Sequence, residues 1–305
     1  MFWRLCLAAL LSQLPALSQI FTDIHVEKVA GKLLYAAGPV WSRDGYLVYS
    51  DIPASRIYTL IPPPPAEENE SSAAVLTEAR IALYRENSGG AAGITLDAQG
   101  RLYTCETHAR RVTRTDKRGK LEVLASKYQG KRLNSPGDIV VRHDGQVYFT
   151  DPAFGSANEA RELDFYGVFH ITPKGEISLV SKWPTRPRGV TLSPNGGTLY
   201  VADADLHLVR AYDLDPHGAS SNERVFVSNI KGVPGGLRTD EHGNIYVAAA
   251  EVPVYSPSGK QIGVIPTSEV PSNLAFGDDD FSSLYITAHT SVYRLHLQVK
   301  GSVQY

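Results

Sequence analysis

The sequence is poor in cysteine and has no excess of charge of either sign. Only two of its 305 residues are cysteines, and Lys plus Arg (30) nearly balance Asp plus Glu (32), for a net charge of −2. This balance excludes the basic surface that nucleic-acid binding requires and gives no sign of an acidic, solvating tail. We therefore expect no nucleic-acid partner.

Long apolar runs are also missing, apart from one near the N-terminus. Arg4 precedes the apolar run Leu5–Leu11, and Ala16 and Ser18 supply small residues at the spacing that a signal peptidase needs. The run is too short to span a bilayer. We predict a signal peptide over residues 1–18 and an exported protein, either periplasmic or secreted, with no membrane attachment after cleavage. A plain N-terminal helix is the alternative.

Removal of this segment leaves Cys105 as the one cysteine, so the mature chain cannot form an internal disulfide. Cys105 ends the apolar sequence Leu-Tyr-Thr-Cys, which favours a buried structural thiol over a nucleophile. Familiar catalytic motifs are absent as well: there is no Gly-x-Ser-x-Gly elbow, no His-Glu-x-x-His zinc helix and no phosphate-binding glycine loop.

What the sequence does contain is one pattern repeated six times. Each copy has a turn with Gly or Pro, a short apolar strand, a polar turn usually built on Asp-Gly, and a second strand ending near a Tyr. In the first copy Ala37–Trp41 leads through Asp44 and Gly45 to Tyr46–Asp51. Asp-Gly and Asn-Gly pairs favour tight hairpins because both turn residues need positive φ. The six copies begin at Ala37, Ala92, Gly137, Arg188, Gly235 and Asn273.

These starting points lie 38 to 55 residues apart, which is about the length of a four-stranded propeller blade. A single blade cannot bury both faces, and a closed ring of blades also removes exposed sheet edges. The sequence therefore predicts an all-β fold, a six-bladed β-propeller formed by residues 19–305 as one domain. We expect Ile24–Val29 to complete the last blade, and we expect a monomer.

The amino-acid sequence of the repeats resembles that of the gluconolactonase family, which includes regucalcin (the senescence marker protein) and luciferin-regenerating enzyme. The similarity covers nearly the whole mature chain, and its clearest stretches are Ala37–Trp41, Lys131–Asp138, Phe149–Pro152, Arg186–Gly189 and Val270–Asn273. The resemblance implies hydrolysis of a lactone or related ester, with one divalent cation, often calcium, in the central funnel. Such a cation polarises the substrate carbonyl, and a nearby carboxylate acts as base to a water.

The same resemblance implies that one residue of each blade stands at the mouth of the tunnel: Ala37, Ala92, Gly137, Arg188, Gly235 and Asn273. Family members usually carry Glu, Asn, Asn, Asn, Asp and Asn there, and the Glu, one Asn and the Asp bind the metal. Only Asn273 keeps its type. A hard cation needs six or more oxygen ligands, which Ala37, Gly137 and Gly235 cannot supply from side chains, and Arg188 adds positive charge. We expect no bound metal and no other cofactor.

Four residues are candidates for ligand binding: Arg188, Asn273, Glu106 and His289. A guanidinium in the funnel could hold a carboxylate or phosphate bidentately, or it could simply pair with Asp203 or Asp205 at the rim. Glu106 with His108 could act as an acid–base pair, and His289 could reach toward the funnel from the last blade. Acidic residues that end the second strand of a blade, however, more often fix turns by accepting backbone N–H bonds, and His289 could equally lie in an outer turn. No catalytic residue can be assigned from the sequence.

Two functions therefore stay open. The first is a gluconolactonase-type hydrolase with altered catalytic groups. The second is a non-catalytic propeller that binds a small anionic ligand, a sugar or a protein through its funnel. In either case we expect a small molecule, such as a lactone or sugar acid, in the central funnel.

Overall fold

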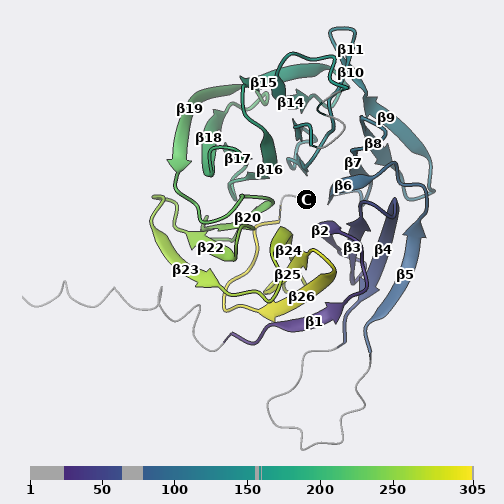
Figure 1. Cartoon of the computed structure of the whole chain (residues 1–305), viewed down its shortest axis with the longest axis vertical. Coiled ribbons are helices and arrows are strands. Elements are labelled where there is room, and N and C mark those ends of the chain that lie inside the picture. Colours follow the sequence, from purple (N-terminus) through teal and green to yellow (C-terminus); the bar gives the residue numbers. More distant parts are fainter. Residues whose placement is uncertain (1–23, 64–77, 155–157, 159, 304–305) are drawn as a thin grey trace, which may run out of the picture.

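The computed structural model describes residues 24–63, 78–154, 158 and 160–303. Six antiparallel four-stranded sheets stand around a central axis, so the predicted six-bladed β-propeller is confirmed (Figure 1). The first strand of each blade is nearest the axis, and the last lies on the outside. The predicted signal peptide, residues 1–18, lies outside the described residues and stays a prediction.

In each of the first three blades, the four strands follow chain order from the axis outward. Blade 1 has β2 (Ala36–Ser42), β3 (Tyr46–Asp51), β4 (Arg56–Ile61) and β5 (Arg80–Arg85). Blade 2 has β6 (Ala91–Leu96), β7 (Leu102–Glu106), β8 (Arg111–Thr115) and β9 (Leu121–Ala125). Blade 3 has β12 (Ile139–Val141), β13 (Val147–Asp151), β14 (Tyr166–Ile171) and β15 (Ile177–Trp183). A short hairpin between blades 2 and 3 consists of β10 (Lys127–Tyr128) and β11 (Lys131–Arg132).

The other three blades complete the ring. Blade 4 has β16 (Pro187–Leu192), β17 (Thr198–Asp203), β18 (Leu208–Leu214) and β19 (Ser220–Val227). Blade 5 has β20 (Leu237–Thr239), β21 (Ile245–Val247), β22 (Val252–Tyr255) and β23 (Gln261–Ile265). Blade 6 has β24 (Pro271–Gly277), β25 (Ser283–Ala288), β26 (Ser291–His296) and β1 (Glu27–Ala30).

Blade 6 joins the two ends of the chain. β1 pairs antiparallel with β26, so the prediction that an early strand completes the last blade is confirmed. Glu27 faces Arg294 in this pairing, and their side chains form an ion pair. The Arg294 guanidinium also donates to the carbonyl oxygen of Pro63 at 2.8 Å. Closure of the ring therefore uses main-chain and charged side-chain contacts together.

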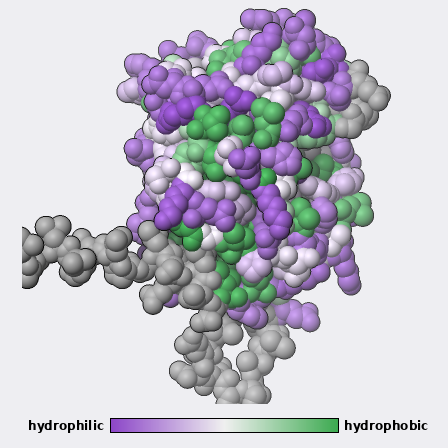
Figure 2. Space-filling model, turned by 60° about the vertical axis from the view of Figure 1, so that its left-hand side comes forward, coloured by the Kyte–Doolittle hydropathy of each residue, from purple (hydrophilic) through white to green (hydrophobic). Residues whose placement is uncertain are grey.

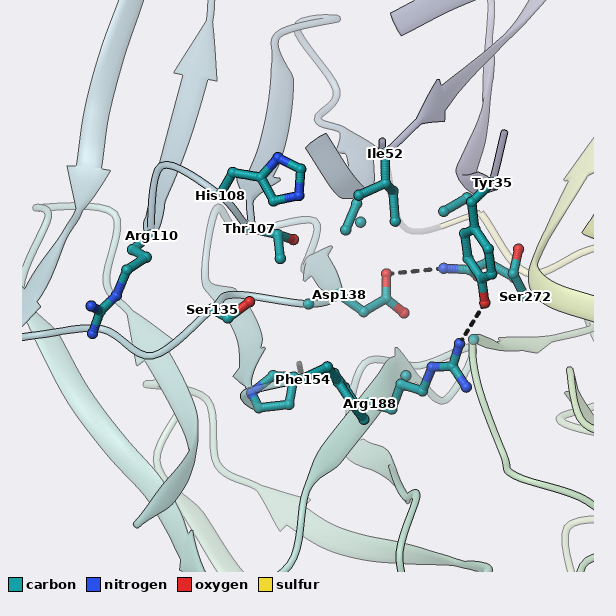
Figure 3. Close-up of a pocket in the computed structure, with 18 of the residues that line it drawn as sticks. Tyr35, Ile52, Thr107, His108, Arg110, Ser135, Asp138, Phe154, Arg188 and Ser272 are labelled. Carbon is teal, nitrogen blue, oxygen red and sulfur yellow. Dashed lines mark hydrogen bonds between the residues drawn. The ribbon is translucent and has the colours of Figure 1, made fainter. Parts of the chain in front are cut away.

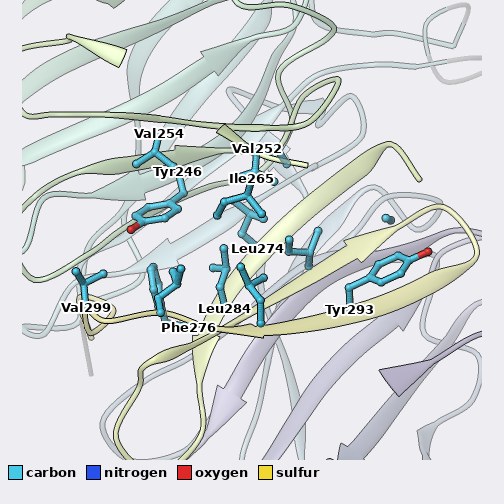
Figure 4. Close-up of a cluster of buried hydrophobic side chains, with 14 residues drawn as sticks. Tyr246, Val252, Val254, Ile265, Leu274, Phe276, Leu284, Tyr293 and Val299 are labelled. Atoms are coloured by element: carbon cyan, nitrogen blue, oxygen red, sulfur yellow. The ribbon is translucent and has the colours of Figure 1, made fainter. Parts of the chain in front are cut away.

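The hydrophobic core lies between the faces of adjacent blades. In one such cluster, Tyr246 and Val254 of blade 5 pack with Leu274, Phe276 and Leu284 of blade 6 (Figure 4). The alternating apolar residues of the repeats supply these side chains, because successive strand residues point to opposite faces. Full burial of one such aliphatic or aromatic side chain contributes about 1.5–3 kcal/mol.

Near the axis, glycines let neighbouring inner strands approach closely. A Cβ atom on Gly38 would lie 1.9 Å from the carbonyl oxygen of Ala92, and one on Gly189 would lie 2.0 Å from that of Gly235. Gly93 and Gly236 are crowded in the same way by the following blade. The glycine in these four repeats is therefore a packing requirement of the ring.

A second kind of contact between blades comes from the last residue but one of a blade's second strand. Ser50 Oγ donates to the carbonyl oxygen of Ala92 at 3.2 Å, and Thr150 Oγ1 donates to that of Arg188 at 2.6 Å. Cys105 holds the same place in blade 2, and its Sγ lies 3.5 Å from the carbonyl oxygen of Asp138. The thiol is buried, and burial raises its pKa well above the usual value. The prediction of a buried structural thiol is confirmed.

The outer surface of the ring mixes hydrophilic residues with smaller hydrophobic areas (Figure 2). Exposed apolar side chains on the outer strands include Ile81, Leu83, Leu121, Val123 and Val225. Across the described part of the chain, no helix has the length and apolar character needed to cross a bilayer.

Candidate ligand-binding funnel

A cavity of about 1000 Å³ opens at the axis, where the inner strands of all six blades begin (Figure 3). Its polar lining includes Tyr35, Thr107, His108, Ser135, Asp138, Arg188, Ser272 and Asn273. Small residues, among them Ala37, Ala92 and Gly137, form much of the wall. Because these side chains are short, the cavity keeps a large volume at the point where the blades converge.

Strand pairing sets which residues stand level with one another around this cavity. Val190 faces Val201 in blade 4, and Ile94, Ile139 and Leu237 occupy the equivalent paired position in their own blades. In each blade, the residue two positions before this reference position belongs to what we call the upper ring. Its members are Ala37, Ala92, Gly137, Arg188, Gly235 and Ser272. The residue one position before the reference position belongs to the lower ring. Its members are Gly38, Gly93, Asp138, Gly189, Gly236 and Asn273.

The prediction that Asn273 stands level with Arg188 is therefore wrong by one residue. Pro271 pairs with Ala288 as Pro187 pairs with Asp203, so Ser272 is the counterpart of Arg188. Asn273 instead belongs to the lower ring. Gly235 is in the predicted ring, but Gly236 rather than Gly235 contributes to the cavity wall.

Asp138 and Asn273 form the floor of the funnel. They are the two lower-ring residues with polar side chains, and Asn273 Nδ2 donates to Asp138 Oδ1 at 3.2 Å across the axis. The Val190 N–H donates to Asp138 Oδ2 at 3.1 Å. Burial raises the pKa of Asp138, while the charge of Arg238 and these hydrogen bonds lower it in part. The carboxyl group is thus buried, oriented and biased toward its neutral form.

The sequence analysis missed Asp138 as a funnel residue, although a signal was present. Four of the six lower-ring positions are glycine, and Asp138 and Asn273 interrupt that pattern. A Cβ on Gly236 would lie 1.9 Å from Asn273 Oδ1, and one on Gly93 would lie 2.7 Å from Asp138 Oδ1. The glycines therefore make the room in which the two polar side chains meet.

Arg188 is half-buried in the wall of the cavity, and its Nη2 donates to Tyr35 Oη at 2.9 Å. Tyr35 is itself positioned by Asp51, whose Oδ1 accepts the Tyr35 N–H at 3.1 Å. The alternative pairing of Arg188 with rim aspartates is wrong. Asp203 pairs with Arg210 at 3.1 Å, and Asp205 pairs with Arg186.

Two other candidates, Glu106 and His289, do not line the cavity. Glu106 is 1% exposed and pairs with Arg85 at 2.7 Å and with Arg111 at 2.6 Å. These two arginines balance its negative charge outside the cavity lining. His289 is exposed, and its ring lies 5.5 Å from the ring of Tyr35. It contacts the funnel only through that tyrosine.

The other strand-ending acids fix turns, as expected. Asp51 accepts the Leu34 and Tyr35 N–H groups, and Asp203 accepts the Leu206 N–H at 3.0 Å. Asp151 accepts the N–H groups of Asn134 and Ser135, each at 2.7 Å. These bonds shape the loops that carry Tyr35 and Ser135 to the cavity.

The sequence profile of the SMP-30/Gluconolactonase/LRE-like region matches residues 35–290, which include blades 1 to 5, the two inner strands of blade 6 and the whole funnel lining. The chain belongs to the SMP-30/gluconolactonase/LRE-like family. It is 28% identical over 308 residues to a gluconolactonase of Zymomonas mobilis, covering 95% of this chain and 85% of that protein.

Solved structures of the SMP-30/gluconolactonase/LRE-like family share the same architecture. A gluconolactonase from Xanthomonas campestris is 27% identical, with a TM-score of 0.80 and coverage of 92% of each chain. A calcium-binding regucalcin from Agrobacterium tumefaciens is 18% identical, with a TM-score of 0.73, and covers 90% of this chain and 96% of that one. At 18% identity, the similarity to this regucalcin shows a shared fold and nothing more.

The funnel lining offers few side-chain donors and acceptors at its upper ring. The upper ring offers a hydroxyl at Ser272 and a guanidinium at Arg188, and its other four members are Ala or Gly. Asp138 carries the one carboxyl group among the described residues of the lining. No group of three or more His, Cys, Asp and Glu side chains is arranged to hold a metal ion within the described ranges.

Proposed function

We propose that the funnel binds a small, hydroxylated carboxylate or lactone, such as a sugar acid, without a divalent cation. The observation that carries this proposal is Arg188, held by Tyr35 in the wall of an axial cavity whose remaining upper-ring residues are small. A guanidinium presents several N–H donors in a plane that matches the two oxygens of a carboxylate. Asp138 and Asn273 on the floor supply donors and acceptors for ligand hydroxyl groups.

The chemistry of the residues argues against the family's metal. Calcium takes six to eight oxygen ligands, several of them charged, whereas one buried carboxyl group of raised pKa is at hand. A guanidinium in the same wall repels a cation. In this proposal Arg188 supplies the positive charge that faces the ligand's carboxylate or carbonyl oxygen.

Chelation is expected to leave both stability and ligand binding unchanged. EDTA-treated protein should melt at the same temperature with and without added calcium, zinc, manganese or magnesium, and should bind D-gluconate equally well in calorimetric titrations. A cation with a functional site would instead stabilise the fold by about 2.7 kcal/mol at a hundredfold excess over its Kd. A clear rise in Tm with one cation, together with tighter gluconate binding, would contradict the metal-free proposal.

Lactone hydrolysis is the second candidate, and the position of Asp138 favours it. An ionised Asp138 at the cavity floor can take the proton from a water that attacks the lactone carbonyl, while Arg188 polarises the carbonyl oxygen. The ring C–O bond then breaks, and the leaving oxygen takes up a proton. Neither Glu106 nor His289 is needed.

The affinity for gluconate is expected to fall as the pH rises through the pKa of Asp138. Burial raises this pKa, so the floor is neutral at low pH and acquires a negative charge near the bound carboxylate at higher pH. Asp138→Asn should flatten the dependence, which titrations between pH 4 and 8 would measure. Lactone hydrolysis, if it occurs, should have the opposite pH profile and be lost in the same variant. An Asp138→Asn protein with an unchanged pH profile would rule out this role.

Export, to either the periplasm or the exterior, and a monomeric state remain parts of the proposal that depend on the sequence alone.

A further inference from the structure

Ser135 is a buried polar residue whose hydroxyl group has no partner. It lines the cavity, is 1% exposed, and its Oγ forms no hydrogen bond within the described structure. Its backbone N–H is held by Asp151, so the residue has a fixed place. In Figure 3 the hydroxyl points toward the space between Thr107 and Asp138. An unpaired buried hydroxyl costs stability, which makes one at a cavity wall a candidate contact for ligand.

Two arginines, Arg110 and Arg132, line the same cavity as this hydroxyl. Arg110 also contributes to the lining, is 9% exposed, and is fixed by the carbonyl oxygens of Leu133 (2.7 Å) and Ala160 (3.0 Å). Its Nη2 has no hydrogen-bond partner, and no carboxylate of the described residues pairs with it within 4 Å. Arg132, which is exposed, also lines this part of the cavity.

Two carboxyl groups lie close to these residues: Glu162 accepts the Arg132 N–H at 2.8 Å, and Asp151 accepts the Ser135 N–H at 2.7 Å. Burial raises the pKa of Asp151 to about 7, although the Asn134 and Ser135 N–H groups and the charge of Arg110 lower it in part. Figure 3 shows Arg110 and Ser135 on the side of the cavity away from Arg188 and Tyr35. The funnel therefore has cationic groups at two separated places.

We propose that Ser135, backed by Arg110 and Arg132, forms a second subsite that takes a second anionic oxygen group of the ligand. The inference rests on the proposed function, in which Arg188 holds the first such group. The ligand class is then a dianion, either a dicarboxylic sugar acid or a sugar acid that carries a phosphate. Ser135 Oγ donates to the second group, and the arginines supply the field that attracts it.

The test compares three probes by calorimetric titration: D-gluconate with one carboxylate, D-glucarate with two, and 6-phosphogluconate with a carboxylate and a phosphate. At least one dianion is expected to bind about tenfold or more tightly than gluconate, the scale of one hydrogen bond to a charged group. Ser135→Ala should remove that preference, so that the favoured dianion binds no more tightly than gluconate. Because Ser135 Oγ has no hydrogen-bond partner among the described residues, this substitution breaks none of the hydrogen bonds that they form.

Thr104→Val is the matched control. Thr104 Oγ1 is also buried and unpaired, but the residue lies in β7 and does not line the cavity. This variant should keep the full preference for the dianion. A preference for glucarate alone or for 6-phosphogluconate alone identifies the second group as carboxylate or phosphate.

Equal affinity for all three probes, with no effect of Ser135→Ala, would overturn the second subsite while the proposed function stood. Absence of binding by every probe would instead overturn the proposed function, and the subsite with it.

Discussion

Replacing Arg188 by glutamine is expected to weaken D-gluconate binding by about 10- to 150-fold. Hydrogen bonds to charged groups contribute about 1.5–3 kcal/mol, and in the proposed function this guanidinium, held beside Tyr35, is the charged donor to the ligand. Glutamine keeps a polar side chain, although a shorter one, and loses the positive charge and the fork geometry. Titration calorimetry at neutral pH and low ionic strength would measure the change in Kd.

The control for this experiment is Arg224→Gln, which removes the same charge elsewhere. Arg224 lies on the outer strand β19 and pairs with Asp213 at 2.8 Å, with both side chains about half exposed. Exposed pairs of this kind contribute little. Tyr35→Phe should fall between the two, because it removes only the hydroxyl that positions Arg188. If Arg188→Gln binds gluconate as tightly as Arg224→Gln does, the ligand is held by other groups.

Gly189→Ala, one residue further along the same strand, should destabilise the fold by about 3 kcal/mol or more. The new Cβ would lie 2.0 Å from the carbonyl oxygen of Gly235 and 2.8 Å from Gly236 Cα. Both are main-chain atoms of the neighbouring blade, so relief requires blades 4 and 5 to separate. Overpacking costs about 1–3 kcal/mol where side chains can adjust, and main chain adjusts less. For a chain of this size Tm should fall by about 5 °C or more.

Gly197→Ala supplies the comparison within the same blade. Its Cβ would meet only the Asn195 side chain, at 3.3 Å, and a small rotation would relieve that contact. The two variants differ in the atoms that they approach, whereas the chemical change is identical. Similar Tm values for both would mean that the ring tolerates wider spacing at the axis.

The repeats were enough to predict the ring, the number of blades and the strand that closes it. Hairpin turns and alternating apolar residues are local signals, and six copies of a pattern that cannot bury its faces alone leave few architectures. The buried state of Cys105 and the turn-fixing role of Asp51, Asp151 and Asp203 followed from the same local pattern.

The funnel was harder to predict, because it depends on register and on contacts between blades. The repeat pattern alone places Asn273 in the upper ring, one residue too far along the chain. The better guide was proline, since Pro136, Pro187, Pro234 and Pro271 all precede the upper ring. Their alignment assigns Ser272 to that ring, as strand pairing does.

Contacts far apart in sequence decided the remaining residues. Arg85 and Arg111 hold Glu106 away from the cavity, and Tyr35, 153 residues distant, positions Arg188. The unpaired hydroxyl of Ser135 is visible only once its surroundings are known. No repeat pattern records which polar groups lack a partner.

Blade 6 is built from strands of both ends of the chain, and this affects the order in which the protein folds. Glu27 and Arg294, which pair in that blade, are separated by 267 residues. During synthesis β1 is among the first strands made, yet its partner β26 appears only when nearly the whole chain has been translated. Contacts across such a span form late, since the entropy of closing the loop must be offset first. Until then blade 1 has an open side and β24–β26 have an unpaired edge, so we expect the nearly closed ring to be the species most prone to aggregation.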